Sequence, residues 1–223
     1  TYTALKDFNS LINISSNLIG VHLEGPFINP KKLGAQPDLT IKPSIEFINK
    51  INEIAEIKTI TLAPEIEGME KFISFLIDQN INVQFGHTLA DSKTCEKYMT
   101  FNDVSFTHLY NAMSDNHHRN PGVLSSALNN GKFAEIICDL NHVSEESILI
   151  AKKCIPDLYA ITDSIAASGM NDGGYKFANV EIEKKDNKVY LSGTKTLAGS
   201  VVNMHDTFLN LLKMNISIQD VVR

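Results

Sequence analysis

The stretch Gly20-Val21-His22-Leu23-Glu24-Gly25-Pro26-Phe27 has the pattern of a buried strand that runs into a turn. Val21 and Leu23 alternate with His22 and Glu24, and successive strand side chains point to opposite faces. The histidine and the glutamate therefore share one face, with the glutamate at the end of the strand. Because a carboxylate in apolar sequence needs a cation or a hydrogen-bond donor, we expect other polar groups to meet Glu24.

Later segments of the chain end in a similar way. Strand-like runs end at His87, at His108 and at Asp163. The ends of several strands meet at one edge only if the strands are parallel neighbours. A glutamate, two histidines and an aspartate at one edge are typical of the active site of a metal-dependent hydrolase.

Strand-like and helix-like segments alternate along most of the chain. The expected strands are Leu18–Leu23, Ile60–Pro64, Ile81–Phe85, Val104–His108, Glu135–Asp139 and Leu158–Thr162. Helices with apolar residues at helical spacing are expected between them, for example at Ser44–Glu56 and Glu67–Gln79. An α/β fold of the TIM type, a (β/α)8 barrel with polar residues at its strand ends, explains this order. An open doubly wound sheet is the alternative, but its phosphate-binding glycine pattern is absent.

The segment from about 170 to 194 interrupts this alternation. Val180 and Ile182, then Val189 and Leu191, flank a polar turn as in a β-hairpin. We interpret the segment as a β insertion in a barrel loop. About six strand–helix units are present where a complete barrel has eight. We therefore expect residues 1–223 to form one partial, truncated barrel whose first strands precede Thr1.

The composition argues against several classes of partner. The chain has 223 residues, a net charge of −6 and no basic run, so a nucleic-acid partner has little support. No apolar stretch reaches the length that spans a membrane. The three cysteines are odd in number and widely spaced, as expected for reduced thiols in a cytoplasmic protein. The sequence starts without a methionine, and we expect it to be the middle of a longer protein.

Glu24, His87 and His108 offer a ligand set that suits zinc or another first-row divalent ion. Three protein ligands leave a position for water, whose pKa the metal lowers toward neutrality. Asp163 is placed to accept the water's proton and to return it to a leaving group. Each residue also has a structural interpretation: a histidine can serve as a hydrogen-bonding partner, Glu24 can pair with a lysine, and Asp163 can cap a helix. Their joint occurrence at successive strand ends favours the metal site.

Six motifs occur in order along the chain: His22-Leu23-Glu24-Gly25-Pro26-Phe27, Leu62-Ala63-Pro64-Glu65, Gly86-His87-Thr88, Thr107-His108-Leu109-Tyr110-Asn111-Ala112-Met113, Asp139-Leu140-Asn141-His142 and Ile161-Thr162-Asp163. Together they resemble the motifs of the N-acetylglucosamine-6-phosphate deacetylase family, in the amidohydrolase superfamily. The resemblance covers essentially the whole chain, and its first and fourth motifs are highly specific to that family.

The resemblance implies a role for each matching residue. Glu24, His87 and His108 match the metal ligands of the family. Asp163 matches its catalytic aspartate. His142 matches the histidine that hydrogen-bonds and polarises the acetyl carbonyl of the substrate.

The resemblance also implies a sugar-phosphate site. The residues that match it are Ala35, Gln36, Asn111, Ala112, Arg119, Leu197, Ala198 and Gly199. Among these, Asn111, Ala112 and Arg119 match positions that hold the sugar phosphate, and the guanidinium of Arg119 can form paired hydrogen bonds with a phosphate. In the family this arginine reaches the site of the neighbouring subunit, which implies a homodimer.

The expected reaction is therefore the metal-dependent hydrolysis of N-acetylglucosamine 6-phosphate to glucosamine 6-phosphate and acetate. Zinc is the expected ion, with iron, cobalt or manganese as alternatives. Many amidohydrolases carry a His-x-His pair on the first barrel strand, which this chain lacks, so the number of ions, one or two per subunit, is left undecided. We also expect the piece to lack the terminal β domain of the family and to be unstable or inactive when isolated.

Two other functions are weighed against this one. Cyclic-amide hydrolases such as dihydroorotase-like or allantoinase-like proteins typically use a carboxylated lysine, whereas the corresponding strand here offers Glu24. A non-catalytic barrel that binds a sugar phosphate is disfavoured by Asp163 and by the complete set of one glutamate and two histidines.

Overall fold

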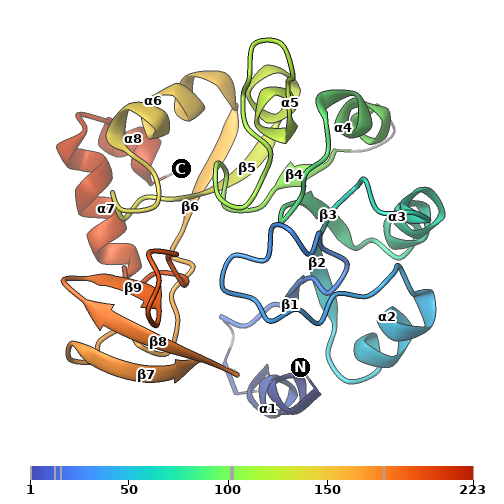
Figure 1. Cartoon of the computed structure of the whole chain (residues 1–223), viewed down its shortest axis with the longest axis horizontal. Helices are drawn as coiled ribbons and strands as arrows, with labels where there is room; N and C mark the ends of the chain where they lie inside the picture. Colours follow the sequence, from blue (N-terminus) through green and yellow to red (C-terminus); the bar gives the residue numbers. More distant parts are fainter. Residues whose placement is uncertain (1, 13, 16, 101–102, 178, 223) are drawn as a thin grey trace.

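Six parallel strands form the larger sheet of this computed structural model, which describes residues 2–12, 14–15, 17–100, 103–177 and 179–222. The strands pair in sequence order: β1 (Val21–Glu24), β2 (Ile57–Leu62), β3 (Asn82–Phe85), β4 (Ser105–Phe106), β5 (Phe133–Ile137) and β6 (Asp157–Ile161). Figure 1 shows these strands curving around a common centre, with helices on the outside. This order confirms the predicted barrel-type fold, because a doubly wound sheet reverses its strand order part-way.

The helices follow the strands and cover the outer face of the curved sheet (Figure 1). They are α1 (Tyr2–Ile12), α2 (Ile45–Asn52), α3 (Met69–Asp78), α4 (Ser92–Met99), α5 (Val123–Asn130), α6 (Glu145–Cys154), α7 (Met204–Lys213) and α8 (Ile218–Val221). Several of them pack buried apolar residues on the sheet, as Phe72 and Leu76 of α3 illustrate. Within the described part of the chain, no helix is both long and apolar enough to cross a membrane.

The core between sheet and helices follows from the period-two pattern of the strands. In β1 the Leu23 side chain is buried in this core, whereas the Glu24 carboxylate faces a cavity on the other side. Phe27 anchors the loop after β1. Its ring centroid lies 5.8 Å from that of Phe47 in α2 and 4.6 Å from that of Phe72 in α3, both edge to face.

Several predicted strands are shifted by a few residues, and one is much shorter than predicted. The strand expected at Val104–His108 is only Ser105–Phe106, because His108 has a φ of 29° and leaves the extended region. Helix α4 begins after Asp91, whose side chain accepts a hydrogen bond from the Thr94 N–H.

The β insertion contains three antiparallel strands, β7 (Gly173–Phe177), β8 (Val180–Lys185) and β9 (Lys188–Leu191). The predicted hairpin is β8 and β9. Its turn residues Asp186 and Asn187 have φ values of 51° and 60°, the left-handed conformation that tight hairpins need. Strand β7 was not predicted, because Gly173 and Gly174 favour loops.

Candidate active site

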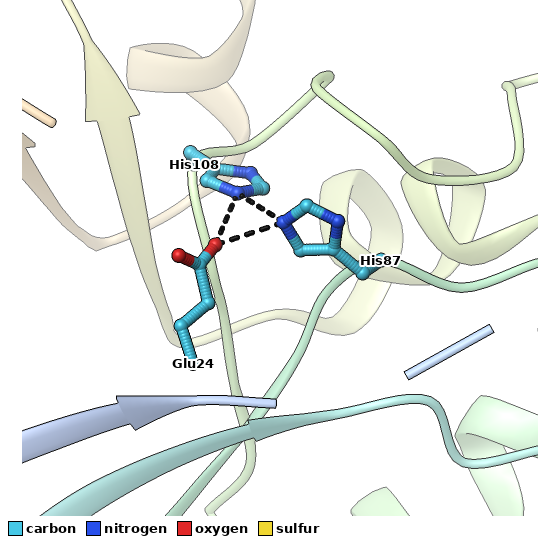
Figure 2. Close-up of side chains that lie close together, drawn as sticks. All are labelled: Glu24, His87 and His108. Atoms are coloured by element: carbon cyan, nitrogen blue, oxygen red, sulfur yellow. Dashed lines mark hydrogen bonds and ion pairs between the residues drawn. The ribbon is translucent and has the colours of Figure 1, made fainter. Parts of the chain in front are cut away.

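The three predicted metal ligands converge at the C-terminal edge of the sheet (Figure 2). Glu24 is the last residue of β1, and His87 and His108 each follow the end of their strand by two positions. Glu24 Oε1 lies 2.8 Å from His87 Nε2 and 2.9 Å from His108 Nε2, and the two Nε2 atoms are 3.1 Å apart. Both histidines are 5% exposed, whereas 33% of the Glu24 side chain is exposed toward the cavity.

The donor set of this cluster fits a divalent metal ion. One ligand atom from each of Glu24, His87 and His108 lies within 4.8 Å of the others. His87 Nδ1 lies 2.6 Å from the Lys32 carbonyl oxygen. A carbonyl can only accept, so Nδ1 carries a hydrogen and Nε2 is the ring nitrogen available to bind a metal ion. Two imidazole nitrogens and a carboxylate oxygen pointing at one spot are the ligands that zinc and related ions prefer.

The carboxylate and the imidazoles of the cluster also interact electrostatically. Burial by itself would raise the pKa of Glu24, but hydrogen bonds to His108 and His87 and their charges lower it well below its usual range. Burial would lower the pKa of His108, but the hydrogen bond and charge of Glu24, with a smaller contribution from Asp163, raise it to about 9. The site thus favours an ionised carboxylate and positive charge beside it.

Asp163 lies on the wall of the same cavity, two positions after β6 ends. Burial raises the pKa of its carboxyl, and the charge of Glu24 raises it further, partly offset by His108. Asp163 has a φ of 49°, and its carbonyl accepts a 2.8 Å hydrogen bond from the Ser200 N–H. Gly199 permits this approach, since an added Cβ would lie 2.6 Å from Ile165.

His142 is held by Asp139, a partner to which sequence reasoning gave no role. Asp139 Oδ2 lies 2.7 Å from His142 Nδ1, and Asp139 Oδ1 accepts from the N–H groups of Asn141 and His142 at 2.8 and 2.9 Å. These hydrogen bonds, with the charge of His142, outweigh burial and lower the pKa of Asp139. Because a carboxylate only accepts, Nδ1 carries the hydrogen, and Nε2 is the free ring nitrogen of a histidine that lines the cavity.

The cavity has a volume of about 1120 Å³ and gathers most of the predicted substrate residues. Those on its wall are Ala35, Gln36, Asn111, Ala112, His142, Leu197 and Gly199. Two others lie elsewhere in this chain. Ala198 is fully buried and packs with Ile182 and Val189. Arg119 is exposed, with Nη1 2.8 Å from His118 Nε2.

Sequence reasoning missed several residues of the cavity and its surroundings. The wall also includes Lys31, Lys32, Phe177, Asn179, Lys195 and Thr196. Phe177 and Asn179 come from the β insertion, so its position explains their place on the wall. Lys32 contributes a backbone carbonyl to His87, and a carbonyl leaves no mark in the sequence because every residue has one.

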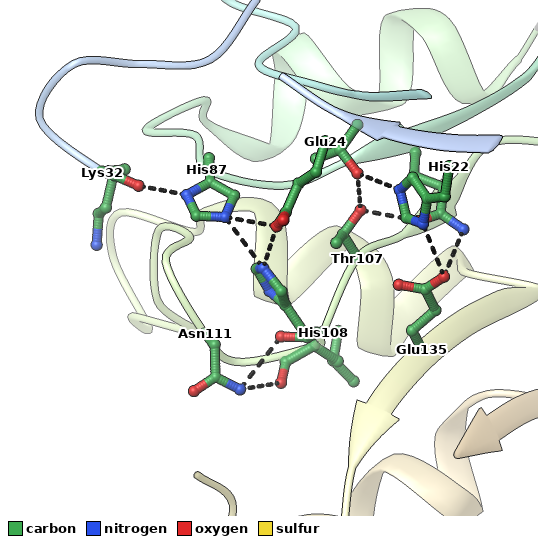
Figure 3. A network of polar contacts seen from close by, with 11 residues as sticks. His22, Glu24, Lys32, His87, Thr107, His108, Asn111 and Glu135 are labelled. Carbon is green, nitrogen blue, oxygen red and sulfur yellow. Dashed lines mark hydrogen bonds and ion pairs between the residues drawn. The ribbon is translucent and has the colours of Figure 1, made fainter. Parts of the chain in front are cut away.

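A chain of polar side chains lies beside the ligands inside the curved sheet (Figure 3). His22 Nε2 lies 2.7 Å from Thr61 Oγ1, which lies 2.7 Å from Thr107 Oγ1. Thr107 Oγ1 donates to Gln84 Oε1 at 2.8 Å, and Gln84 Nε2 donates to Glu135 at 3.1 Å. These hydrogen bonds link β1, β2, β3 and β5 next to the site and satisfy polar groups that would be costly to bury alone.

Comparison with known proteins identifies relatives along nearly the whole chain, although no family model matches. The N-acetylglucosamine-6-phosphate deacetylase of Bacillus subtilis (strain 168) is 39% identical over 199 residues, which cover 86% of this chain and 50% of that protein. The protein of the same name from Caenorhabditis elegans is 35% identical over 222 residues, which cover 94% of this chain and 53% of that protein. This chain is a homologue of N-acetylglucosamine-6-phosphate deacetylases. It spans about half the length of the curated relatives it matches.

Solved N-acetylglucosamine-6-phosphate deacetylase structures share the fold. The Thermotoga maritima structure is 31% identical, with a TM-score of 0.90, over 99% of this chain and 61% of that chain. A mutant of the Mycobacterium smegmatis protein, in complex with N-acetyl-D-glucosamine-6-phosphate, is 26% identical, with a TM-score of 0.91, over 99% of this chain and 60% of that chain. The resemblance indicated by the sequence motifs is thus confirmed, and so is the barrel fold.

Proposed function

We propose that the protein containing this chain hydrolyses N-acetylglucosamine 6-phosphate to glucosamine 6-phosphate and acetate. The observation that carries the proposal is the convergence of Glu24, His87 and His108 in one cavity with Asp163 and His142. The curated relatives bear the name of this reaction. We further propose that residues 1–223 are part of one barrel domain, with the segment at about 170–194 as a loop insertion.

Glu24, His87 and His108 would hold the metal ion. Zinc suits one carboxylate and two imidazoles best, with iron, cobalt or manganese as alternatives and one or two ions per subunit. A divalent ion held there lowers the pKa of a water molecule and polarises a carbonyl group. His87 is prepared for this role by the Lys32 carbonyl, which directs its Nε2 into the site.

Asp163 would transfer protons, and His142 would contact the acetyl carbonyl. Asp163 accepts a proton from the attacking water and returns it to the amide nitrogen as the carbon–nitrogen bond breaks. His142, whose Nδ1 is held by the Asp139 carboxylate, would present Nε2 to the acetyl carbonyl and polarise it. Water oxygen ends in acetate, and the leaving nitrogen ends as the amine of glucosamine 6-phosphate.

The remaining predicted residues would bind the sugar and its phosphate. Gln36, Asn111 and Leu197 lie on the cavity wall, where they would contact a sugar bound in the cavity. Arg119 is exposed and is not among the described residues that line the cavity of its own chain. Its assignment to the phosphate therefore requires a second copy, and we propose a homodimer. The proposed cytoplasmic location rests on the three widely spaced cysteines.

Acetate release by the full-length protein tests the function. We expect hydrolysis of N-acetylglucosamine 6-phosphate that stops when a chelator removes the metal and returns when zinc is added. Hydrolysis of a hydantoin instead would favour a cyclic-amide hydrolase. Binding of the sugar phosphate without acetate release, in metal-loaded protein, would favour a non-catalytic sugar-phosphate protein. The relatives favour neither alternative.

A further inference from the structure

The orientation of His87 depends on contacts outside the cavity. Its φ is 49°, a left-handed conformation that a non-glycine residue keeps only when its surroundings enforce it. Its ring direction is fixed by the 2.6 Å contact between Nδ1 and the Lys32 carbonyl. The turn after β3 and the loop after β1 must therefore keep a fixed position relative to each other.

Asn29 shapes the part of the loop that presents this carbonyl. Its backbone N–H donates to the His87 carbonyl at 2.9 Å, and its own carbonyl accepts from the Lys32 N–H at 2.9 Å. Its side-chain Oδ1 accepts from the Lys31 N–H, also at 2.9 Å. Asn29 is thus the residue through which the loop is tied to the histidine turn.

Glu65 joins the two segments with one carboxylate. It follows β2 by three positions and closes the Leu62-Ala63-Pro64-Glu65 motif. Glu65 Oε1 accepts from Asn29 Nδ2 at 2.8 Å and from the Leu89 N–H at 2.7 Å. Glu65 Oε2 accepts from Thr88 Oγ1 at 2.5 Å. Glu65 therefore bonds to Asn29 in the loop after β1 and to Thr88 and Leu89, which directly follow His87.

We propose that Glu65 is a positioning residue for His87 and for the metal ion that His87 would bind; this rests on the proposed function. Glu65 is not among the described residues that line the cavity, so it acts through other residues. Its carboxylate keeps Asn29 and the Thr88–Leu89 pair together. This holds the left-handed His87 backbone and the Lys32 carbonyl in place. Removing a group that orients a metal-binding histidine commonly lowers the metal affinity by about 10- to 100-fold.

Two substitutions in the full-length protein test the proposal, with zinc as the probe. Glu65→Ala removes all three acceptor contacts, and we expect the zinc dissociation constant to rise about 10- to 100-fold. Glu65→Gln keeps an oxygen for Asn29 and Leu89 but offers Thr88 a donor, so a smaller rise is expected. Glu67→Gln is the matched control, because Glu67 is exposed and pairs only with Lys42 among the ion pairs of the described residues.

The readouts are zinc affinity, the melting temperature of the metal-free protein, and acetate release. A zinc dissociation constant for Glu65→Ala and Glu65→Gln equal to that of Glu67→Gln, even with a lowered melting temperature, would overturn the proposal and leave Glu65 a structural residue. If Glu65→Ala does not fold, Glu65→Gln decides. Weakened zinc binding in the variants, with no acetate release by the unsubstituted protein, would support the role of Glu65 while refuting the proposed reaction.

Discussion

At the scale of single residues, the site is built on strained backbone. His87, His108 and Asp163 have φ values of 49°, 29° and 49°. Left-handed conformations of non-glycine residues cost on the order of 1–3 kcal/mol each and persist where surrounding contacts enforce them. Here those contacts are specific, such as the Ser200 N–H bonded to the Asp163 carbonyl. Three of the residues proposed for chemistry are thus held in a conformation that their surroundings must enforce.

Asp163→Asn separates proton transfer from metal binding. The amide keeps the size of the side chain but cannot accept a proton, so we expect kcat to fall by about 10²- to 10⁴-fold. Metal content should stay unchanged, since the three predicted ligands are intact. Acetate release and metal analysis of the full-length protein provide the measurement, with Asp78→Asn on the outer end of α3 as the control. A metal-replete Asn variant with full activity would remove Asp163 from this role.

Asp139→Asn tests the carboxylate behind His142. The hydrogen bonds that the Asp139 carboxylate accepts lower its folded-state pKa below the unfolded value. The resulting stabilisation is therefore present above the unfolded pKa of about 3.9 and is lost as the pH falls through the folded-state pKa. Near neutral pH we expect the substitution to lower the free energy of unfolding by roughly 1–3 kcal/mol. Denaturant unfolding across pH should show this difference shrinking in acid; a difference that does not depend on pH would contradict it.

Some residues of the site could be predicted from the sequence, and others could not. Glu24, His87 and His108 could be predicted, because a polar residue at the end of an apolar strand needs a partner and parallel strands bring such ends together. Asp139, Glu65 and the Lys32 carbonyl received no role. They act through turns and backbone groups, and the spacing of residue types does not encode which loops will meet.

At the scale of elements, periodicity predicted most strands and helices, because one face of each is buried against its neighbour. It failed where tertiary contacts override local preference. Strand β4 is shorter than predicted since His108 turns into the site, and β7 forms on a pair of glycines because β8 offers a pairing edge. The wall formed by the β insertion could not be predicted, since its sequence does not specify where the small sheet packs.

Phe27→Ala tests how the loop after β1 is anchored. Phe27 is completely buried between Phe47 of α2 and Phe72 of α3. Removing the ring leaves a cavity at the junction of these elements, and we expect a loss of roughly 3–5 kcal/mol in the free energy of unfolding. Leu39→Ala, in the same loop but 67% exposed, should change it by less than about 0.5 kcal/mol. Denaturant unfolding of both variants measures this, and equal losses would refute the anchoring role.

At the scale of the whole molecule, the proposed metal site connects distant parts of the chain. Glu24, His87 and His108 belong to the ends of β1, β3 and β4, so an ion bound to all three cross-links segments that separate on unfolding. Within the described residues, β1 and β6 each pair with one strand of the larger sheet. Unpaired strand edges tend to associate with other chains. Stability should therefore be measured on the full-length protein.

Because a bound ion would cross-link these segments, zinc should stabilise the full-length protein against unfolding. An ion that binds only the folded state adds about 2.7 kcal/mol when its free concentration is 100 times the dissociation constant. We expect the melting temperature of the metal-free protein to rise on adding zinc, and His108→Ala to lose most of that rise. His205→Ala is the matched control, because His205 is an exposed histidine of α7 and should keep the full rise. If His108→Ala retained the same zinc-dependent rise as His205→Ala, the stabilising zinc would be bound elsewhere, and the three-residue site would not be the cross-link.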